Sequence, residues 1–161
     1  MPRAYRVEEL SDVDQSRAAC DRLLSQLPDW FGTYDVYQDY LDDLATRHVF
    51  GVAVSNTVVG LMALTETSKA NMDIHVFAVA PAMHGKGVGR ALVIQAERFA
   101  AEKGKHFLTV KTLGPSHPSL PYRKTRGFYQ AVGFAPIEEY ADFWGKGYPM
   151  LLLCKSVKSS G

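Results

Sequence analysis

The sequence predicts an α/β fold with one mixed, mostly antiparallel sheet of six to seven strands and about four helices on its two sides. Three observations predict it. The 161 residues have the length of a single domain. Apolar residues make up 47% of the chain, enough for a core. These residues form short β-rich runs that alternate with longer segments of helical spacing, and such a mixture favours one sheet covered by helices. We expect one domain over residues 1–157 and a tail over residues 158–161.

The N-terminal part of the chain predicts one strand and two helices. Tyr5–Glu8 alternates between polar and apolar residues and suits a first strand. A helix is expected over Ser11–Leu24, because its first residue is a good N-cap and acidic residues follow in the first turn. Pro28 is expected to break the chain. A second helix is expected over Thr33–Leu44, with its first residue as the cap.

The middle of the chain predicts a hairpin and a third long strand. Val49–Val54 and Val58–Leu64 are β-rich runs, and Ser55–Thr57 between them gives a hairpin signal. Glu66–Asn71 is polar and is expected to form a loop, and Asp73–Val79 is expected to form the next strand.

The C-terminal half continues the alternation. Gly87–Lys103 carries apolar residues at helical spacing, and Gly104 is expected to end that helix. The remaining expected elements are a strand over Phe107–Leu113, a proline-rich loop over Gly114–Pro121, a helix over Tyr122–Val132, and strands over Phe134–Tyr140 and Met150–Lys155.

The most informative segment is the connection between the expected strand Asp73–Val79 and the helix that follows it. It contains three glycines at alternate positions, Gly85, Gly87 and Gly89, and the cations Lys86 and Arg90. Glycine lets backbone N–H groups approach a ligand closely, and the first turn of a helix has N–H groups without internal partners at its positive end. The segment therefore predicts a binding site for phosphate.

The spacing excludes two common phosphate loops. A Walker loop requires a hydroxyl residue after the lysine, but Lys86 is followed by Gly87. A dinucleotide loop requires a glycine where Arg90 stands. What remains is a pattern of His84, Gly87 and Gly89 after a strand. This pattern resembles the Gln/Arg-x-x-Gly-x-Gly/Ala motif of the GNAT superfamily of N-acetyltransferases, with histidine in the first place. The alternative is a plain glycine-rich turn.

A second motif supports the same resemblance. Tyr129, Gly133 and Phe134 match the Tyr-x-x-x-Gly-Phe pattern with which GNAT proteins end their last helix. The two motifs occur in the family's order, and the resemblance covers about residues 48–155. The chain is similar to small bacterial-type members of the superfamily.

The resemblance implies an acyltransferase with the GNAT fold, in which the central strand pair is splayed. Such an enzyme moves an acetyl group from acetyl-CoA to a primary amine of a small molecule or peptide by direct attack, without a metal. The resemblance assigns cofactor binding to Phe77, Ala78, Val79, His84, Gly85, Lys86, Gly87, Val88, Gly89, Arg90, Tyr122, Arg126 and Tyr129. Tyr122 departs from many relatives, which have asparagine there.

The chemistry requires an acid, an oxyanion donor and a base. The resemblance implies that Tyr129 protonates the departing thiolate, and a phenol is protonated at neutral pH. A backbone N–H near Val79 is the expected oxyanion donor. Asp73 and His75 are candidate bases, together as a relay or singly, and water is the alternative. The alternative to these catalytic roles is a structural one: Tyr129 and His75 would be core residues, and Asp73 would only begin the strand.

Aromatic residues predict the acceptor side. Trp30, Phe31 and Trp144 occupy segments that border the acceptor in relatives, and Lys111 is a candidate for holding an acidic substrate group. The alternatives are core packing for the aromatic residues and a solvated cation for Lys111.

Net charge and hydropathy indicate which classes of binding partner are not expected. The net charge of +1 gives no case for nucleic-acid binding. No apolar run approaches the length of a membrane span, and the N-terminus lacks a signal-peptide pattern. Cys20 and Cys154 are expected to be reduced thiols, so we expect a cytoplasmic protein. Homodimers are common in the family, but nothing in the sequence indicates one. Two other functions stay open: a CoA-binding sensor without turnover, and a nucleotide-binding interaction module.

Overall fold

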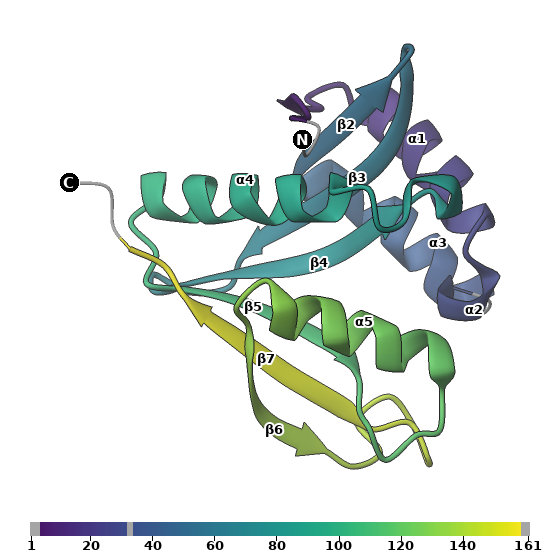
Figure 1. Cartoon of the computed structure of the whole chain (residues 1–161), viewed down its shortest axis with the longest axis vertical. Helices are drawn as coiled ribbons and strands as arrows, with labels where there is room; N and C mark the ends of the chain where they lie inside the picture. Colours follow the sequence, from purple (N-terminus) through teal and green to yellow (C-terminus); the bar gives the residue numbers. More distant parts are fainter. Residues whose placement is uncertain (1–3, 32–33, 159–161) are drawn as a thin grey trace. The chain divides into compact units, whose positions relative to one another are not determined.

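The computed structural model describes residues 4–31 and 34–158 and contains the expected alternation of strands and helices (Figure 1). The strands are β1 Val7–Glu9, β2 His48–Val54, β3 Thr57–Glu66, β4 Asn71–Val79, β5 Phe107–Leu113, β6 Ala135–Tyr140 and β7 Met150–Ser156. The α-helices are α1 Val13–Ser25, α2 Pro28–Phe31, α3 Tyr34–Asp43, α4 Val88–Glu102 and α5 Leu120–Ala131, and two 3₁₀ turns are η1 Leu44–Thr46 and η2 Pro81–Met83. Within the described residues there is thus one more α-helix than expected.

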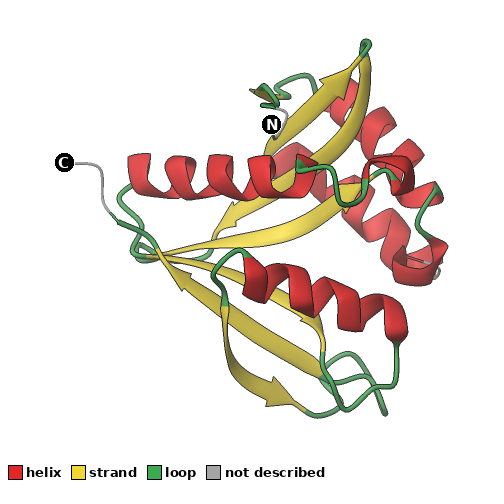
Figure 2. Cartoon of the chain, in the orientation of Figure 1, coloured by secondary structure: helices red, strands yellow, loops and turns green. Residues whose placement is uncertain are grey.

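The seven strands form one sheet in the order β1-β2-β3-β4-β5-β7-β6 (Figure 2). The pairs β1–β2, β2–β3, β5–β7 and β6–β7 are antiparallel, and β4–β5 is parallel. The predicted mixed, mostly antiparallel sheet is confirmed. The parallel pair requires a crossover, which α4 provides. The register of β4 with β5 covers Asn71–Ile74 and Phe107–Val110, and the expected splay of this pair stays a prediction.

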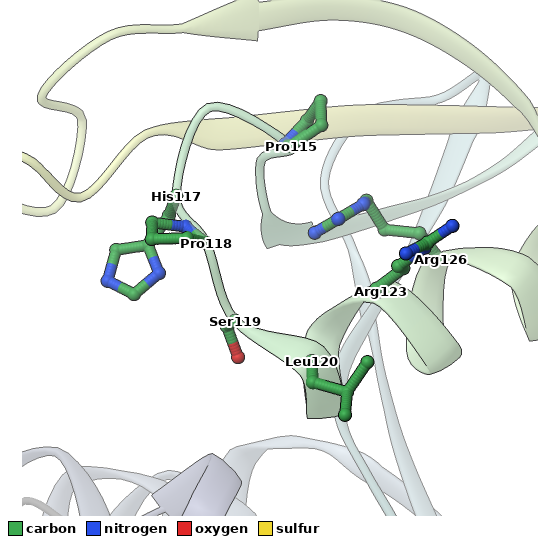
Figure 3. Close-up of a pocket in the computed structure, with 7 residues that line it drawn as sticks. All are labelled: Pro115, His117, Pro118, Ser119, Leu120, Arg123 and Arg126. Carbon is green, nitrogen blue, oxygen red and sulfur yellow. The ribbon is translucent and has the colours of Figure 1, made fainter.

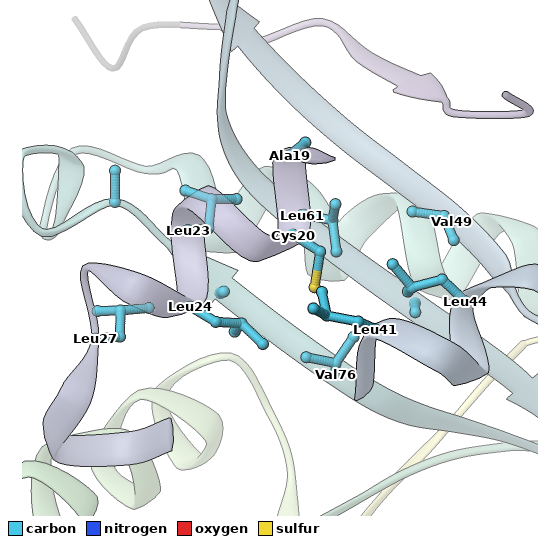
Figure 4. Close-up of a cluster of buried hydrophobic side chains, with 13 residues drawn as sticks. Ala19, Cys20, Leu23, Leu24, Leu27, Leu41, Leu44, Val49, Leu61 and Val76 are labelled. Atoms are coloured by element: carbon cyan, nitrogen blue, oxygen red, sulfur yellow. The ribbon is translucent and has the colours of Figure 1, made fainter. Parts of the chain in front are cut away.

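The chain divides into two compact units, Met1–Thr65 with His75–Arg98 and Glu66–Ile74 with Phe99–Gly161. The first unit has its core where α1, the end of α3 and η1 pack against β2, β3 and β4 (Figure 4). Its buried cluster consists of Ala19, Cys20, Leu23, Leu24, Leu27, Leu41, Leu44, Val49, Leu61, Ala63, Val76, Ala78 and Ala80. In α1 these residues recur every three or four positions and form one apolar stripe.

In the second unit, α5 contacts β5 and β6. Buried apolar residues of this unit come from β5, from the end of α5 and the turn after it, and from β7: Leu108, Val110, Leu113, Tyr129, Val132, Phe134, Met150, Leu151 and Leu153. Gly133 follows the last residues of α5 with a φ of 103°, which confirms its expected place just beyond the helix end.

The start of the first helix was predicted one residue too early. Asp12, and not Ser11, is the N-cap of α1. Its Oδ1 accepts hydrogen bonds from the N–H groups of Asp14 at 3.0 Å and Gln15 at 3.2 Å. A carboxylate at the N-cap also interacts favourably with the positive end of the helix, which explains why Asp12 caps it in place of Ser11.

Prolines account for two further corrections. Pro28 was expected to break the chain, but it begins α2, because proline lacks only an N–H that a first helical residue does not use. Pro121 was assigned to a loop, but it lies in the first turn of α5, whose N-cap is Ser119. Thr33, the expected cap of the second helix, and residues 159–161 of the tail lie outside the described residues.

The hairpin between β2 and β3 is confirmed, with a shorter turn than expected. Ser55 and Asn56 have φ values of 52° and 64°, so these two residues form the turn and Thr57 already belongs to β3. Two consecutive residues with positive φ are typical of the type I′ turn, which matches the twist of paired strands. In the described parts of the chain, no helix has the length and apolar character that crossing a membrane demands.

Candidate functional site

The connection from β4 to α4 is a tight turn that requires its glycines. After η2, the N–H of His84 donates to Pro81 O at 3.2 Å and that of Lys86 to Met83 O at 3.4 Å. Gly85 and Gly87 have φ values of 75° and 92°. Residues other than glycine adopt such φ values only with strain. The glycines therefore fix the path by which the chain enters α4.

Several backbone donors of this turn have no hydrogen-bond acceptor among the described residues. The first α-helical hydrogen bond runs from Ala91 N to Gly87 O at 3.1 Å. Among the residues that the structure describes, no acceptor faces the N–H groups of Gly85, Gly87, Val88, Gly89 and Arg90. The side chains of Lys86 and Arg90 are exposed beside them. Unpaired N–H groups at the positive end of a fifteen-residue helix, with two cations, make a site for a phosphate-containing ligand.

The strand residues before the turn differ in what they offer a ligand. Phe77 and Val79 are half-buried, whereas Ala78 is only 3% exposed and belongs to the core cluster. A contact of Ala78 with a cofactor would therefore come from its backbone.

Gly60, in β3, was not predicted to matter, but it determines how closely α4 approaches the sheet. A Cβ atom at this position would lie 2.5 Å from Val88 Cγ1 and 3.1 Å from Leu92 Cδ1. The first two turns of α4 thus rest on a gap that only glycine leaves. An isolated glycine inside a β-rich run was the available signal.

Replacing Gly60 with alanine is expected to lower the free energy of unfolding by about 1–3 kcal/mol, because the added methyl overpacks the contact with Val88. Denaturant titration measures this loss. Gly127→Ala is the matched control, since the new methyl there meets nothing within 4 Å in α5 and is expected to raise stability slightly. An unchanged midpoint for Gly60→Ala would contradict the close packing of α4.

His84 fastens the turn to the end of β4. Its Nε2 lies 2.8 Å from Val79 O, and because a carbonyl only accepts, this nitrogen donates. The ring of Trp30 meets it edge-on, with the ring centroids 6.1 Å apart. Trp30, predicted on the acceptor side, therefore packs beside the glycine-rich turn.

His75, a predicted base, contacts α3. Its Nε2 lies 3.0 Å from Asp43 Oδ2. The ring of Tyr40 packs against it at 5.5 Å between centroids, and Phe31 packs on Tyr40 at the same separation. Burial, and secondarily the charge of Asp43, raise the pKa of Tyr40. Asp43 was not among the predicted residues, and nothing local in the sequence connects it with His75.

Asp73, the other predicted base, has partners on β5. Its carboxyl group is buried, accepts a hydrogen bond from Thr109 Oγ1 at 2.7 Å and lies 3.5 Å from Lys111 Nζ. Asn71 Nδ2 donates to the same Thr109 hydroxyl at 2.8 Å. Lys111 is thus paired with Asp73, and a role for it in holding substrate stays a prediction.

Tyr129 lies on α5 with Tyr122 and Arg126, at spacings that place the three on one helix face. Its side chain is 6% exposed and packs between Phe128 and Phe134, at 5.7 Å and 5.6 Å between ring centroids. The aromatic packing fixes the direction of the phenol.

A pocket of about 270 Å³ lies at the N-terminal end of α5 (Figure 3). It is lined by Pro115, His117, Pro118, Ser119, Leu120, Arg123 and Arg126. Arg126 Nη1 donates to Leu113 O at 2.8 Å, which holds one guanidinium at the wall. The two arginines make the pocket suitable for an anion. Arg123 was not predicted, although its spacing of three residues from Arg126 was a signal.

Trp144 lies in the loop between β6 and β7 and is 49% exposed. Phe143 packs edge-on against it at 5.4 Å between centroids. The loop is shaped by Asp142, whose Oδ1 accepts from Gly147 N at 2.7 Å. This loop presents aromatic surface, as a wall for an acceptor would. In the described parts of the chain, no three His, Cys, Asp or Glu side chains gather where they could hold a metal ion.

Comparison with known proteins shows the family to which the chain belongs. The chain matches the model of the acetyltransferase (GNAT) family over residues 16–134. No curated protein matches it. A GNAT family protein from Desulfovibrio desulfuricans superposes with a TM-score of 0.81 at 21% identity, covering 96% of this chain and 100% of that one.

Two other solved structures contain coenzyme A or acetyl-CoA. An aminoglycoside 6′-N-acetyltransferase complexed with coenzyme A has a TM-score of 0.76 at 14% identity, covering 97% of this chain and 99% of that one. A GNAT acetyltransferase from Elizabethkingia anophelis with acetyl-CoA bound has a TM-score of 0.66 at 19% identity, covering 83% and 90%. At these identities the structures establish the fold alone. Because the family model covers most of the chain, the protein belongs to the acetyltransferase (GNAT) family.

Proposed function

We propose that the protein is an N-acetyltransferase that moves the acetyl group of acetyl-CoA to a primary amine of a small molecule or peptide. The observation that carries the proposal is the set of backbone N–H groups around Gly87 that have no acceptor among the described residues. A pyrophosphate is the ligand that best satisfies such a set. Structures of the same fold with coenzyme A and acetyl-CoA support this choice.

The residues around the turn suit the cofactor. Lys86 and Arg90 would neutralise the pyrophosphate, and His84 would keep the turn attached to β4. Within the second unit, Arg126 is a proposed phosphate contact because of the family resemblance, and Arg123 lines the same pocket at the start of α5. When bound, acetyl-CoA supplies the activated acetyl group.

The reaction needs two protons to leave the amine and one to reach the thiolate. One proton leaves the ammonium to a base, and the nitrogen then bonds to the carbonyl carbon. When the C–S bond breaks, the Tyr129 hydroxyl donates its proton to the thiolate. The second proton of the nitrogen replaces it through solvent. The products are the amide, the thiol of coenzyme A and one released proton.

The acceptor side is proposed from the aromatic residues. Trp30 and Phe31 are half-buried, and Trp144 is exposed, so each has surface left for a ligand. Aromatic faces bind both apolar groups and cationic amines. We propose a cytoplasmic protein that acts on a small-molecule or peptide amine.

Thermal melting with acetyl-CoA tests the proposal first. At about 100 times the dissociation constant, binding adds about 2.7 kcal/mol, which raises the Tm by about 5 °C or more. Equal shifts with adenosine 3′,5′-bisphosphate and acetyl-CoA would indicate a nucleotide-binding module. No shift at millimolar acetyl-CoA would overturn the proposal.

Turnover is then measured as thiol release with an aminoglycoside, a polyamine, amino acids and short peptides with free N-termini. Release that depends on the amine is expected for at least one of them. A melting shift without release for any amine would favour a CoA-binding sensor.

A further inference from the structure

Tyr5, just before β1, reaches the glycine-rich turn between β4 and α4, and both belong to the first unit. A Cβ atom at Gly87 would lie 3.7 Å from Tyr5 Cε2. Apart from the neighbours of Gly87 in the chain, no other described atom comes within 4 Å of that position. At Gly85 the corresponding position meets no described atom within 4 Å. The half-buried ring of Tyr5 therefore borders the turn at Gly87.

The register of the sheet explains how Tyr5 comes to lie there. Val7 of β1 pairs with Val52 of β2, and Val52 pairs with Gly60 of β3. Residues directly opposite each other in paired strands share a face of the sheet, and Gly60 faces Val88 at the start of α4. Residues two apart in an extended chain also share a face. Tyr5, two residues before Val7, thus lies on the face that α4 covers.

The segment that carries Tyr5 is attached to the rest of the first unit. The strand β1 pairs with β2 along its whole length. Directly after it, Leu10 N donates to Val49 O at 2.8 Å, and Leu10 O accepts from Ser16 Oγ at 3.0 Å. Tyr5 is therefore two residues away from a strand that is fixed to both the sheet and α1.

The glycines that let the turn bind an anion also leave it free to change conformation. Glycine adopts positive and negative φ values about equally readily, so the residue itself does not fix the φ of 92° at Gly87. A loop that must be ordered when its ligand binds loses affinity through that ordering. A ring beside Gly87 limits the alternative conformations before the ligand arrives.

We propose that Tyr5 is a positioning residue of the cofactor site, whose ring keeps Gly87 in the conformation that presents the N–H groups of the turn to acetyl-CoA. This inference rests on the acetyltransferase function proposed above. The N–H groups concerned are those of Gly87, Val88 and Gly89, which have no acceptor among the described residues. Tyr5 acts on the cofactor through the backbone of the turn.

Calorimetric titration with acetyl-CoA tests the proposal. Tyr5→Ala is expected to raise the dissociation constant about three- to tenfold, because binding must then order the turn. Tyr5→Phe keeps the ring and is expected to bind like the wild type. In turnover with the fastest amine of the panel above, Tyr5→Ala is expected to raise the KM for acetyl-CoA and to leave kcat unchanged, as the loss of uniform binding does.

Tyr37→Ala is the matched control. Tyr37 lies on α3 of the same unit, is also half-buried, and its hydroxyl donates to Asp21. The same side chain is thus removed at a place away from the turn. Tyr37→Ala is expected to lower the Tm and to leave the dissociation constant of acetyl-CoA unchanged. A purely structural Tyr5 would give this result too, which would contradict the proposal.

The glycine amides of the turn give a readout that needs no cofactor. Aromatic rings shift the NMR signals of nearby nuclei, so Tyr5→Ala is expected to move the amide signal of Gly87, whereas Tyr37→Ala is not. An unmoved Gly87 signal, or wild-type affinity in Tyr5→Ala, would overturn the role of the ring while the proposed function stands. So would a loss of affinity in Tyr5→Phe as large as that in Tyr5→Ala. A wild-type protein that does not bind acetyl-CoA would overturn the proposed function itself, and the role of Tyr5 with it.

Discussion

Gly87→Val is expected to abolish acetyl-CoA binding and to leave the protein folded. Gly87 has a φ of 92°, which a β-branched residue adopts only with strain, so the turn must change its path. The nearest atom to an added Cβ is Tyr5 Cε2 at 3.7 Å, so the effect comes from the backbone and not from a collision. Hydrogen bonds to a charged ligand contribute about 1.5–3 kcal/mol each, so misplacing two N–H groups costs about 100-fold in affinity or more. Isothermal titration calorimetry measures this loss.

The control separates strain from ligand binding. Gly104 has a φ of 74° and open space around an added Cβ, as Gly87 has, but it lies after the C-terminal end of α4. Gly104→Val is therefore expected to cost similar stability and to bind acetyl-CoA like the wild type. Circular dichroism of both variants verifies the fold. Wild-type affinity in Gly87→Val would mean that the glycine-rich turn does not hold the cofactor.

The sequence predicts the fold well where the signals are local. The strand β5 has the predicted bounds, and the turn at Ser55 and Asn56 and the glycine after α5 lie where backbone chemistry places them. The errors concern the short helix α2, which was not predicted, and the ends of other elements. Ser11 and Asp12 are both good caps, and the choice depends on which oxygen reaches the first N–H groups.

In the candidate site too, residues in local motifs could be predicted from the sequence, whereas residues that depend on distant contacts could not. The glycine-rich turn and Tyr129 could be predicted as site residues because each belongs to a motif that is contiguous in the chain. Asp43 and Gly60 were missed because their roles arise from residues far away in sequence: Asp43 lies 32 positions from His75, and Gly60 gains its meaning from α4. The pairing of Lys111 with Asp73 likewise depends on the register of β4 with β5. One sequence without its tertiary contacts cannot supply such pairs.

Tyr129→Phe tests the proposed acid with the smallest change of shape. The substitution removes the hydroxyl and keeps the ring that packs against Phe128 and Phe134. If the hydroxyl protonates the thiolate, kcat is expected to fall about 10²–10⁴-fold, the usual range for a general acid. The dissociation constant of acetyl-CoA is expected to change little, since the hydroxyl acts on charge that develops during the reaction. Steady-state kinetics and calorimetry measure the two quantities separately.

Tyr140→Phe is the matched control, because Tyr140 is 40% exposed on β6 and its hydroxyl is hydrogen-bonded to Glu138. It should retain wild-type kcat. If Tyr129 is only a core residue, the expected result differs. Tyr129→Phe would then change only the free energy of unfolding, by about 0.5–1.5 kcal/mol if the hydroxyl makes one hydrogen bond. A fall in kcat at unchanged stability and affinity therefore identifies an acid, whereas unchanged kcat removes Tyr129 from the mechanism and leaves protonation of the thiolate to solvent.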